Sequence, residues 1–183
     1  MAASFFPTLY LFVPKAPVLA AAVALFAVAA AGEWLRFRNA GLNALVMRWL
    51  RPLTKEKEAA SPFASTYLLA ATSVAVAAFP QPVAVLALFS LALGDPLAAL
   101  IGERFGAHRI AGRSLEGSAA FLLASLGIGG ALLGSGLDTT VGVMVVGAVA
   151  AALFELAPLG LDDNVKVPLG SGGVMALAHH FWA

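Results

Sequence analysis

The stretch that decides the fold is QPVAVLALFSLALGDPLAALIGERFGAHRIAGRSLEGS, residues 81–118. Its first part is an apolar run with the length of a membrane-spanning helix, roughly 20 residues. Asp95 interrupts this run between Gly94 and Pro96. A segment rich in glycine and arginine follows, and a second apolar run starts at Leu115. This order predicts helices that cross a membrane and carry charge at only a few places.

The composition of the whole chain agrees with a membrane protein. Of its 183 residues, 61% are hydrophobic and 11% are charged, and the mean hydropathy is +0.91. A soluble domain has about 25% charged residues, so lipid must cover part of this surface. The absence of cysteine excludes disulfides, zinc-thiolate sites and cysteine nucleophiles. A net charge of +1 gives no reason to expect a nucleic-acid partner, and we expect none.

We predict an all-α, polytopic integral membrane protein that forms one domain over residues 1–183. The expected architecture has about six transmembrane helices. The predicted spans are residues 16–34, 63–79, 82–101, 115–133, 139–157 and 165–182. The apolar segment 4–13 is too short to span and contains Pro7, so we expect an interfacial helix or a re-entrant cap there.

The basic residues predict the orientation in the membrane. All of the 11 Lys and Arg residues except Lys15 lie in three connections, residues 32–62, 102–114 and 158–166. The positive-inside rule places these connections in the cytoplasm. Every acidic residue except Asp138 lies in or beside the same connections. The sequence therefore predicts a multi-pass protein whose site, rich in both signs of charge, faces the cytoplasm.

The triplet Gly94-Asp95-Pro96 predicts a broken helix. Asp is a preferred N-cap and Pro is favoured at the first helical position, so a new helix is expected from Pro96 until Gly106 ends it. Its N-terminus would offer N–H groups and a positive dipole end to an anion. A carboxylate at membrane depth is a functional candidate by default. The alternative is that Asp95 only caps its helix.

The polar segment after this triplet has the residue types of a phosphate site. Its glycines permit tight turns, and its cationic side chains can hold phosphate oxygens. Ser114 is placed to cap the next span, with Glu116 in the first turn. The alternative is an ordinary basic cytoplasmic loop.

Two further groups of acidic residues are metal or catalytic candidates. Glu155 lies near the cytoplasmic end of the fifth predicted span, and Asp162-Asp163-Asn164 follows seven residues later. Oxygen-bearing side chains suit Mg²⁺, which takes one or two carboxylates and keeps several waters. The alternative is a polar turn in which an aspartate caps the sixth span.

Together these residues resemble the signature of the CTP-dependent lipid kinases, which include dolichol, phytol and farnesol kinases and the yeast-type diacylglycerol kinase. That signature is approximately G-D-x-x-A-x-x-x-G, then F-G, then K/R-S-x-E-G-S. Glu155 with DDNVKVPL is similar to its E…D-D-N-x-x-x-P segment, and residues 55–67 are similar to its R/K-x-x-E…G-x-x-Y segment, with Glu58 as the glutamate. The resemblance covers roughly residues 33–169, although Ala64 stands where the family has glycine.

The resemblance implies a single transmembrane lipid-kinase domain, a phosphotransferase with an alcohol acceptor. It implies phosphoryl transfer from CTP, with Mg²⁺, to the hydroxyl of a membrane isoprenoid alcohol or diacylglycerol. The expected catalytic residues are Asp95, Glu116, Glu155 and Glu58, and the expected metal ligands are Asp95, Asp162 and Asp163. The expected nucleotide-binding residues are Gly94, Gly102, Arg104, Gly106, His108, Arg109, Arg113, Ser114, Gly117, Asn164 and Lys166.

Other readings stay open at this point. Phosphatidate cytidylyltransferases carry a related G-D…G-x-x-F-G segment and join CTP to a lipid phosphate. A small membrane transporter would also use a broken helix at a substrate site, but the outer side here has almost no polar residues. The fifth predicted span, rich in Gly and Ala, is suited to packing against a second copy, which would make a homodimer.

Overall fold

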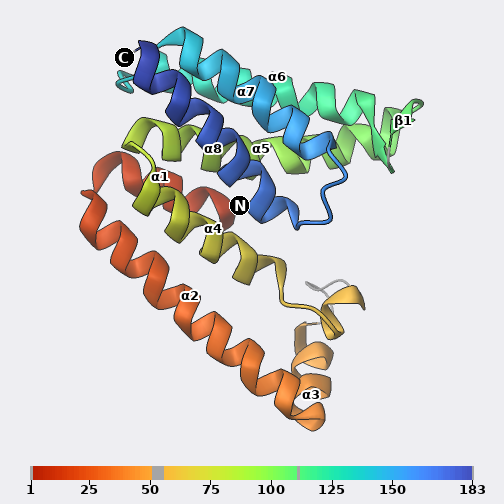
Figure 1. Cartoon of the computed structure of the whole chain (residues 1–183). Helices are drawn as coiled ribbons and strands as arrows, with labels where there is room; N and C mark the ends of the chain where they lie inside the picture. Colours follow the sequence, from red (N-terminus) through yellow and green to blue (C-terminus); the bar gives the residue numbers. More distant parts are fainter. Residues whose placement is uncertain (1, 51–55, 111, 183) are drawn as a thin grey trace.

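The computed structural model describes residues 2–50, 56–110 and 112–182. In this part the chain is almost entirely helical, which confirms the all-α class. The helices are α1 (Phe5–Phe12), α2 (Lys15–Arg38), α3 (Ala40–Leu50), α4 (Ala64–Ala78), α5 (Gln81–Phe105), α6 (Leu115–Gly134), α7 (Val141–Leu156) and α8 (Asp163–Trp182) (Figure 1). Short 3₁₀ turns cover Ala2–Ser4 and Glu56–Ala59, and two strands, β1 (Arg109–Ile110) and β2 (Arg113–Ser114), join α5 to α6.

Helix α5 is the centre of the bundle. It packs against α1, α4, α6, α7 and α8, and its residues 83–92 are all buried. A helix that is apolar on every side is stable when neighbours or lipid surround it. Helix α2 lies at the edge, packs mainly on α4, and leaves Val23, Leu25 and Val28 exposed. The uninterrupted apolar residues 83–92 therefore belong to the core of the bundle.

Among the residues that the structure describes, three helices are long and apolar enough to cross a membrane: α2, α5 and α6. Helices α4 and α7 are apolar but have only 15 and 16 residues. At a rise of about 1.5 Å per residue they fall short of the roughly 30 Å hydrocarbon core. Helix α8 has 20 residues but begins with Asp163 and Lys166 in its first turn. The membrane character is thus supported by three spans, and the count of six stays a prediction.

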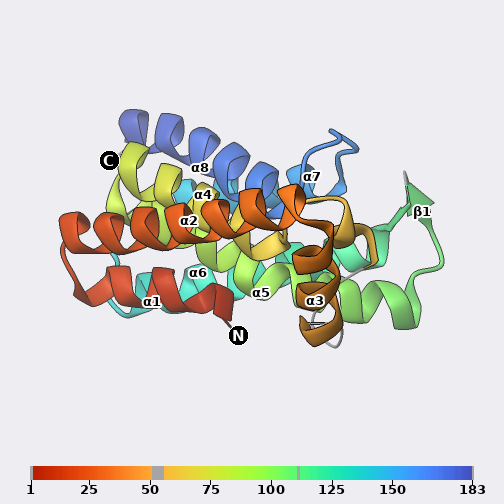
Figure 2. The same cartoon turned by 90° about the horizontal axis from the view of Figure 1, so that it is seen from below.

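The three charged connections lie at one end of the bundle. The segment from α2 through α3 to α4, the β1–β2 hairpin and the α7–α8 loop gather there in both views (Figures 1 and 2). The connections α4–α5 and α6–α7 and the C-terminus lie at the opposite end. The alternation expected from the charges is therefore present in space, while the side of the membrane stays a prediction.

The predicted break at Gly94-Asp95-Pro96 is wrong, because α5 runs without interruption from Gln81 to Phe105 with Pro96 inside it. Proline removes one backbone hydrogen bond, but neighbours in a membrane bundle can compensate for such a loss. Packing on both sides of Pro96 outweighs the local preference of Asp-Pro for a helix start. No helix N-terminus is therefore available to an anion at Asp95.

The other two helix boundaries at the polar segment are confirmed. Gly106 is the C-cap of α5, and its N–H donates to the carbonyl oxygen of Gly102 at 3.2 Å. Ser114 is the N-cap of α6, and its Oγ accepts from the N–H of Gly117 at 3.0 Å. These boundaries fix where the hairpin leaves α5 and returns to α6.

Gly94 serves helix packing, and this gives a first prediction. A Cβ at Gly94 would lie 2.7 Å from a ring carbon of Phe121, which is fully buried. Gly94→Ala should lower stability by about 1–3 kcal/mol through overpacking. Gly127→Ala on α6 is the matched control, because a Cβ there meets nothing within 4 Å. Thermal unfolding in detergent should show a lower Tm for the first variant alone, and equal Tm values would contradict this packing.

Candidate active site

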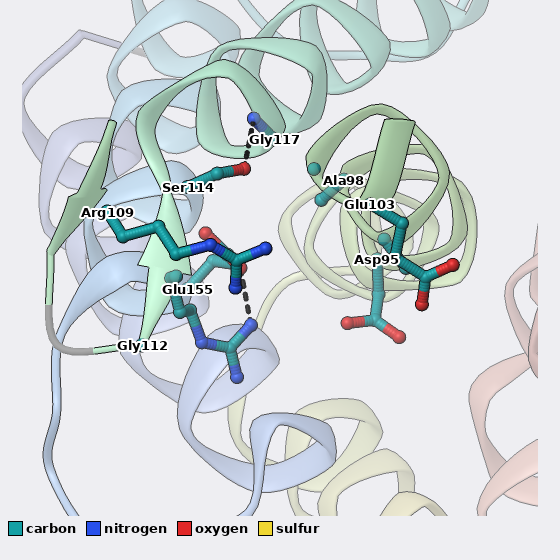
Figure 3. Close-up of a pocket in the computed structure, with 11 residues that line it drawn as sticks. Asp95, Ala98, Glu103, Arg109, Gly112, Ser114, Gly117 and Glu155 are labelled. Carbon is teal, nitrogen blue, oxygen red and sulfur yellow. Dashed lines mark hydrogen bonds and ion pairs between the residues drawn. The ribbon is translucent and has the colours of Figure 1, made fainter. Parts of the chain in front are cut away.

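One face of α5 forms a wall of a cavity of about 350 Å³. The residues on this wall are Asp95, Ala98, Ala99, Gly102 and Glu103. Their spacing of three, four, seven and eight residues from Asp95 places them on one side of a helix. The volume lies in the range of small-molecule sites. An unbroken α5 is what aligns them, as Figure 3 shows for Asp95 and Glu103.

The opposite wall comes from the hairpin, the start of α6 and α7. It carries Arg109, Gly112, Arg113, Ser114, Gly117 and Glu155 (Figure 3). The two strands pair antiparallel, with Arg109 opposite Ser114. Gly112 has a φ of +87°, a conformation that glycine adopts without strain. The glycine- and arginine-rich segment thus becomes a tight hairpin that presents two arginines to α5.

Two glycines bring α6 close to the end of α5. A Cβ at Gly102 would lie 2.6 Å from the Oγ of Ser114, and a Cβ at Gly117 would lie 2.7 Å from the carbonyl oxygen of Ala98. Larger residues would push the two helices apart. These glycines line the cavity, and they also set its width.

A partly buried network of ion pairs and hydrogen bonds stabilises the opposite wall of the cavity. The Arg113 guanidinium donates to the carboxylates of Glu155 and Asp163. Lys166 Nζ lies 3.0 Å from Asp163 Oδ1, and Ser118 Oγ donates to Glu155 Oε2 at 2.7 Å. Glu155 is 3% exposed and Lys166 is 6% exposed. The network therefore joins β2 to helices α6, α7 and α8 through charge-assisted hydrogen bonds.

The network fixes the charge of Arg113. Burial alone lowers the pKa of Arg113, but hydrogen bonds and attraction to Asp163 and Glu155 outweigh it and raise the pKa above its ordinary value. Both oxygens of Glu155 already accept hydrogen bonds, one from Arg113 and one from Ser118. In this arrangement Glu155 holds Arg113 in place, and its catalytic role stays a prediction.

The expected metal ligands do not form one cluster. In the part of the chain that the structure describes, no three His, Cys, Asp or Glu side chains are placed to hold a metal ion. Asp162 Oδ1 accepts from the backbone N–H and the side-chain amide of Asn164, at 3.1 and 2.8 Å. Asp163 is engaged by Arg113 and Lys166. Of the expected set, only Asp95 lines the cavity.

Glu58 belongs to a second buried cluster centred on Arg36. Arg36 is 2% exposed, lies 2.5 Å from Glu33, and donates to the carbonyl oxygens of Glu58 and Ser61 at 2.9 and 2.6 Å. The Glu58 carboxylate accepts from the N–H of Ala64 at the start of α4, at 3.0 Å. This cluster ties the end of α2 to the segment before α4. Glu58 is not among the residues that line the cavity.

Several other expected residues, among them Arg104, His108, Glu116 and Asn164, are not among those that line the cavity. His108 Nδ1 is 2.8 Å from Glu116 Oε1, and the His108 side chain is 77% exposed. Arg104 is exposed at the end of α5, and Asn164 lies in the first turn of α8. Sequence reasoning missed Glu103, which lies eight residues after Asp95. A continuous helix would have placed both on one face, but the predicted break hid this signal.

The two glutamates on α6 and α7 give a second prediction. Glu155→Gln removes one of the two carboxylates that accept from Arg113, and Glu155 is almost fully buried, so we expect a loss of about 1–3 kcal/mol in stability. Glu116→Gln changes a solvent-exposed pair with His108 and should cost less stability than Glu155→Gln. Unfolding of the two variants in the same detergent compares them directly. A larger loss for Glu116→Gln would argue against the network.

Comparisons with known proteins give two relatives, one along most of the chain and one along about half of it. The chain is 27% identical over 178 residues to an uncharacterized protein of Rickettsia prowazekii, covering 92% of this chain and 86% of that protein. It is 34% identical over 110 residues to a phytol kinase of Synechocystis, covering 54% of this chain and 46% of the kinase. No family model matches the chain, and no solved structure matches it. The chain is therefore similar, over about half of its length, to a protein named as a phytol kinase.

Proposed function

We propose that this chain is a CTP-dependent lipid kinase that phosphorylates the hydroxyl of a membrane isoprenoid alcohol of the polyprenol, dolichol or phytol type. The observation that carries the proposal is a cavity in which carboxylates of α5 lie opposite two arginines of the hairpin, one of which is already paired with Glu155 and Asp163. Asp95 and Glu103 line one wall, and Arg109 and Arg113 line the other. The cavity lies at the charged end of a helical bundle with three candidate spans. Similarity to a phytol kinase supports the same reaction class.

The arginine wall suits the donor. A guanidinium matches phosphate oxygens with paired donors, and charge-assisted hydrogen bonds are stronger than neutral ones. Arg113 is held by Glu155 and Asp163 before any nucleotide binds. Arg109 is exposed beside it on β1. A triphosphate between the walls would meet one preorganised and one mobile cation, and preorganisation lowers the cost of binding.

The acidic wall suits the acceptor. Asp95 lies ten residues before the end of α5 at Phe105, which is about 15 Å along a helix. A lipid hydroxyl can reach that depth without leaving the membrane. Its oxygen attacks the γ-phosphorus, a new O–P bond forms, and the bond to the β,γ-bridging oxygen breaks. CDP leaves, and Asp95 accepts the hydroxyl proton.

The donor set also fits a magnesium ion that enters with the triphosphate. Mg²⁺ takes one or two carboxylates and keeps several waters, so Asp95 alone is a sufficient protein ligand. When bound, the ion would neutralise charge on the β- and γ-phosphates. The residues of the chain would position the substrates: the arginines would orient the phosphates, and Asp95 would hold the ion and accept the hydroxyl proton.

The third prediction tests the reaction with Asp95→Asn. The protein is supplied with isoprenoid alcohols, diacylglycerol, Mg²⁺ and CTP labelled at the α or γ phosphate. We expect γ-label in lipid with the wild type and at least a hundredfold loss in Asp95→Asn, because a general base contributes about 10²–10⁴-fold. Asp138→Asn, at the opposite end of the bundle, is the control and should keep full activity.

The label also separates the competing functions. α-Label in a lipid phosphate acceptor would replace the kinase with a cytidylyltransferase. A folded protein that transfers neither label would contradict both enzymes and leave the transporter. Full activity in Asp95→Asn would overturn the role of Asp95.

The fourth prediction concerns the arginine wall. Arg109→Ala should raise the KM for CTP about tenfold and leave kcat within a few-fold, since it removes a charged hydrogen bond to the phosphates. Arg104→Ala is the matched control, because Arg104 is equally exposed but does not line the cavity. Equal effects of the two substitutions would show that only the general positive charge matters.

A further inference from the structure

The carboxylate of Glu103 has no role in the reaction as described. It lines the cavity and is exposed. Glu58 accepts a hydrogen bond from Ala64, and Glu155 accepts one from Arg113. Among the described residues, Glu103 takes part in no such hydrogen bond or ion pair. Figure 3 shows its side chain leaving the same side of α5 as Asp95. An acidic group beside a phosphate-binding wall needs an explanation, because it would repel phosphate oxygens.

The position of Glu103 along α5 relates it to the nucleotide. Glu103 lies eight residues after Asp95, about 12 Å along the helix axis, and two residues before the helix ends at Phe105. The lipid hydroxyl is bound to the membrane, so the γ-phosphate must lie at the depth of Asp95. The nucleoside then extends toward the charged end of the bundle, where Glu103 lies.

The chemistry of a carboxylate selects one part of the nucleoside. A carboxylate accepts hydrogen bonds from the two neighbouring hydroxyls of a ribose, as acidic residues do in dinucleotide sites. It also disfavours phosphates at the same place, which fixes the direction of the nucleotide in the cavity. We propose that Glu103 binds the ribose hydroxyls of the nucleotide and makes this site selective for ribonucleotides. This inference rests on the proposed nucleotide-dependent function.

The test compares nucleotides that differ only in the ribose. Equilibrium binding of CTP and 2′,3′-dideoxy-CTP is measured on the full chain in detergent, separately from turnover with an isoprenoid alcohol. We expect the wild type to bind CTP about tenfold or more tightly than the dideoxy nucleotide, as hydrogen bonds to a charged group imply. Glu103→Ala should bind CTP and 2′,3′-dideoxy-CTP with equal affinity, at the weaker level of the dideoxy nucleotide.

Two further variants sharpen the result. Glu103→Gln keeps one acceptor oxygen and should retain part of the preference, while Asp138→Ala, a carboxylate outside the cavity, should retain all of it. If Glu103→Ala lowers the affinities for CTP and the dideoxy nucleotide by the same factor, the preference for CTP remains and the inference is wrong. A wild type that binds both nucleotides with equal affinity would also overturn it. If the ribose preference depends on Glu103 but no lipid is phosphorylated, the role of Glu103 is supported and the kinase is rejected. A wild type that binds no nucleotide would overturn both.

Discussion

The structure depends on the compensation of charge inside a helical bundle. An ionised carboxylate such as Glu155, almost fully buried, is stable only with charged or polar donors beside it. Arg113 and Ser118 supply those donors, Asp163 is a second carboxylate partner of Arg113, and Lys166 pairs with Asp163. The network therefore decides where β2, α7 and α8 meet. It also orders one guanidinium of the cavity wall in advance, because Arg113 cannot turn away without leaving the buried Glu155 without its cationic partner.

The second constraint is the close approach of α5 and α6. Helix association among lipid-facing helices gains little from the hydrophobic effect and relies on packing and small residues. The ring of Phe121 packs against Gly94. Ser114 packs against Gly102, and the α5 backbone packs against Gly117. The same glycines that resemble a kinase signature are thus packing residues in this structure. Packing and chemistry share them, because the cavity exists only where the two helices converge.

Local sequence determined part of this architecture. The apolar runs, the gathering of charged connections at one end, and the caps at Gly106 and Ser114 follow from composition over a few residues. The continuity of α5 was not predictable in this way, because tertiary packing overrides an Asp-Pro start signal. The partners of Asp163 and Glu58 come from distant segments, and the hairpin strands have two residues each and no periodicity. Glu103 was missed because the predicted break at Gly94-Asp95-Pro96 hid the fact that Asp95 and Glu103 share one face of a continuous helix.

An uninterrupted α5 has a consequence for how such a protein would choose its lipid. A broken helix can hinge, and a hinge would let the reacting carboxylate follow substrates at different levels of the bilayer. A continuous rod, clamped on α6 by Gly94, holds Asp95 at one level set by the helix rise. Under the proposed function, lipids would be sorted by how deeply their hydroxyl lies below the headgroups, and tails of very different length would be accepted alike.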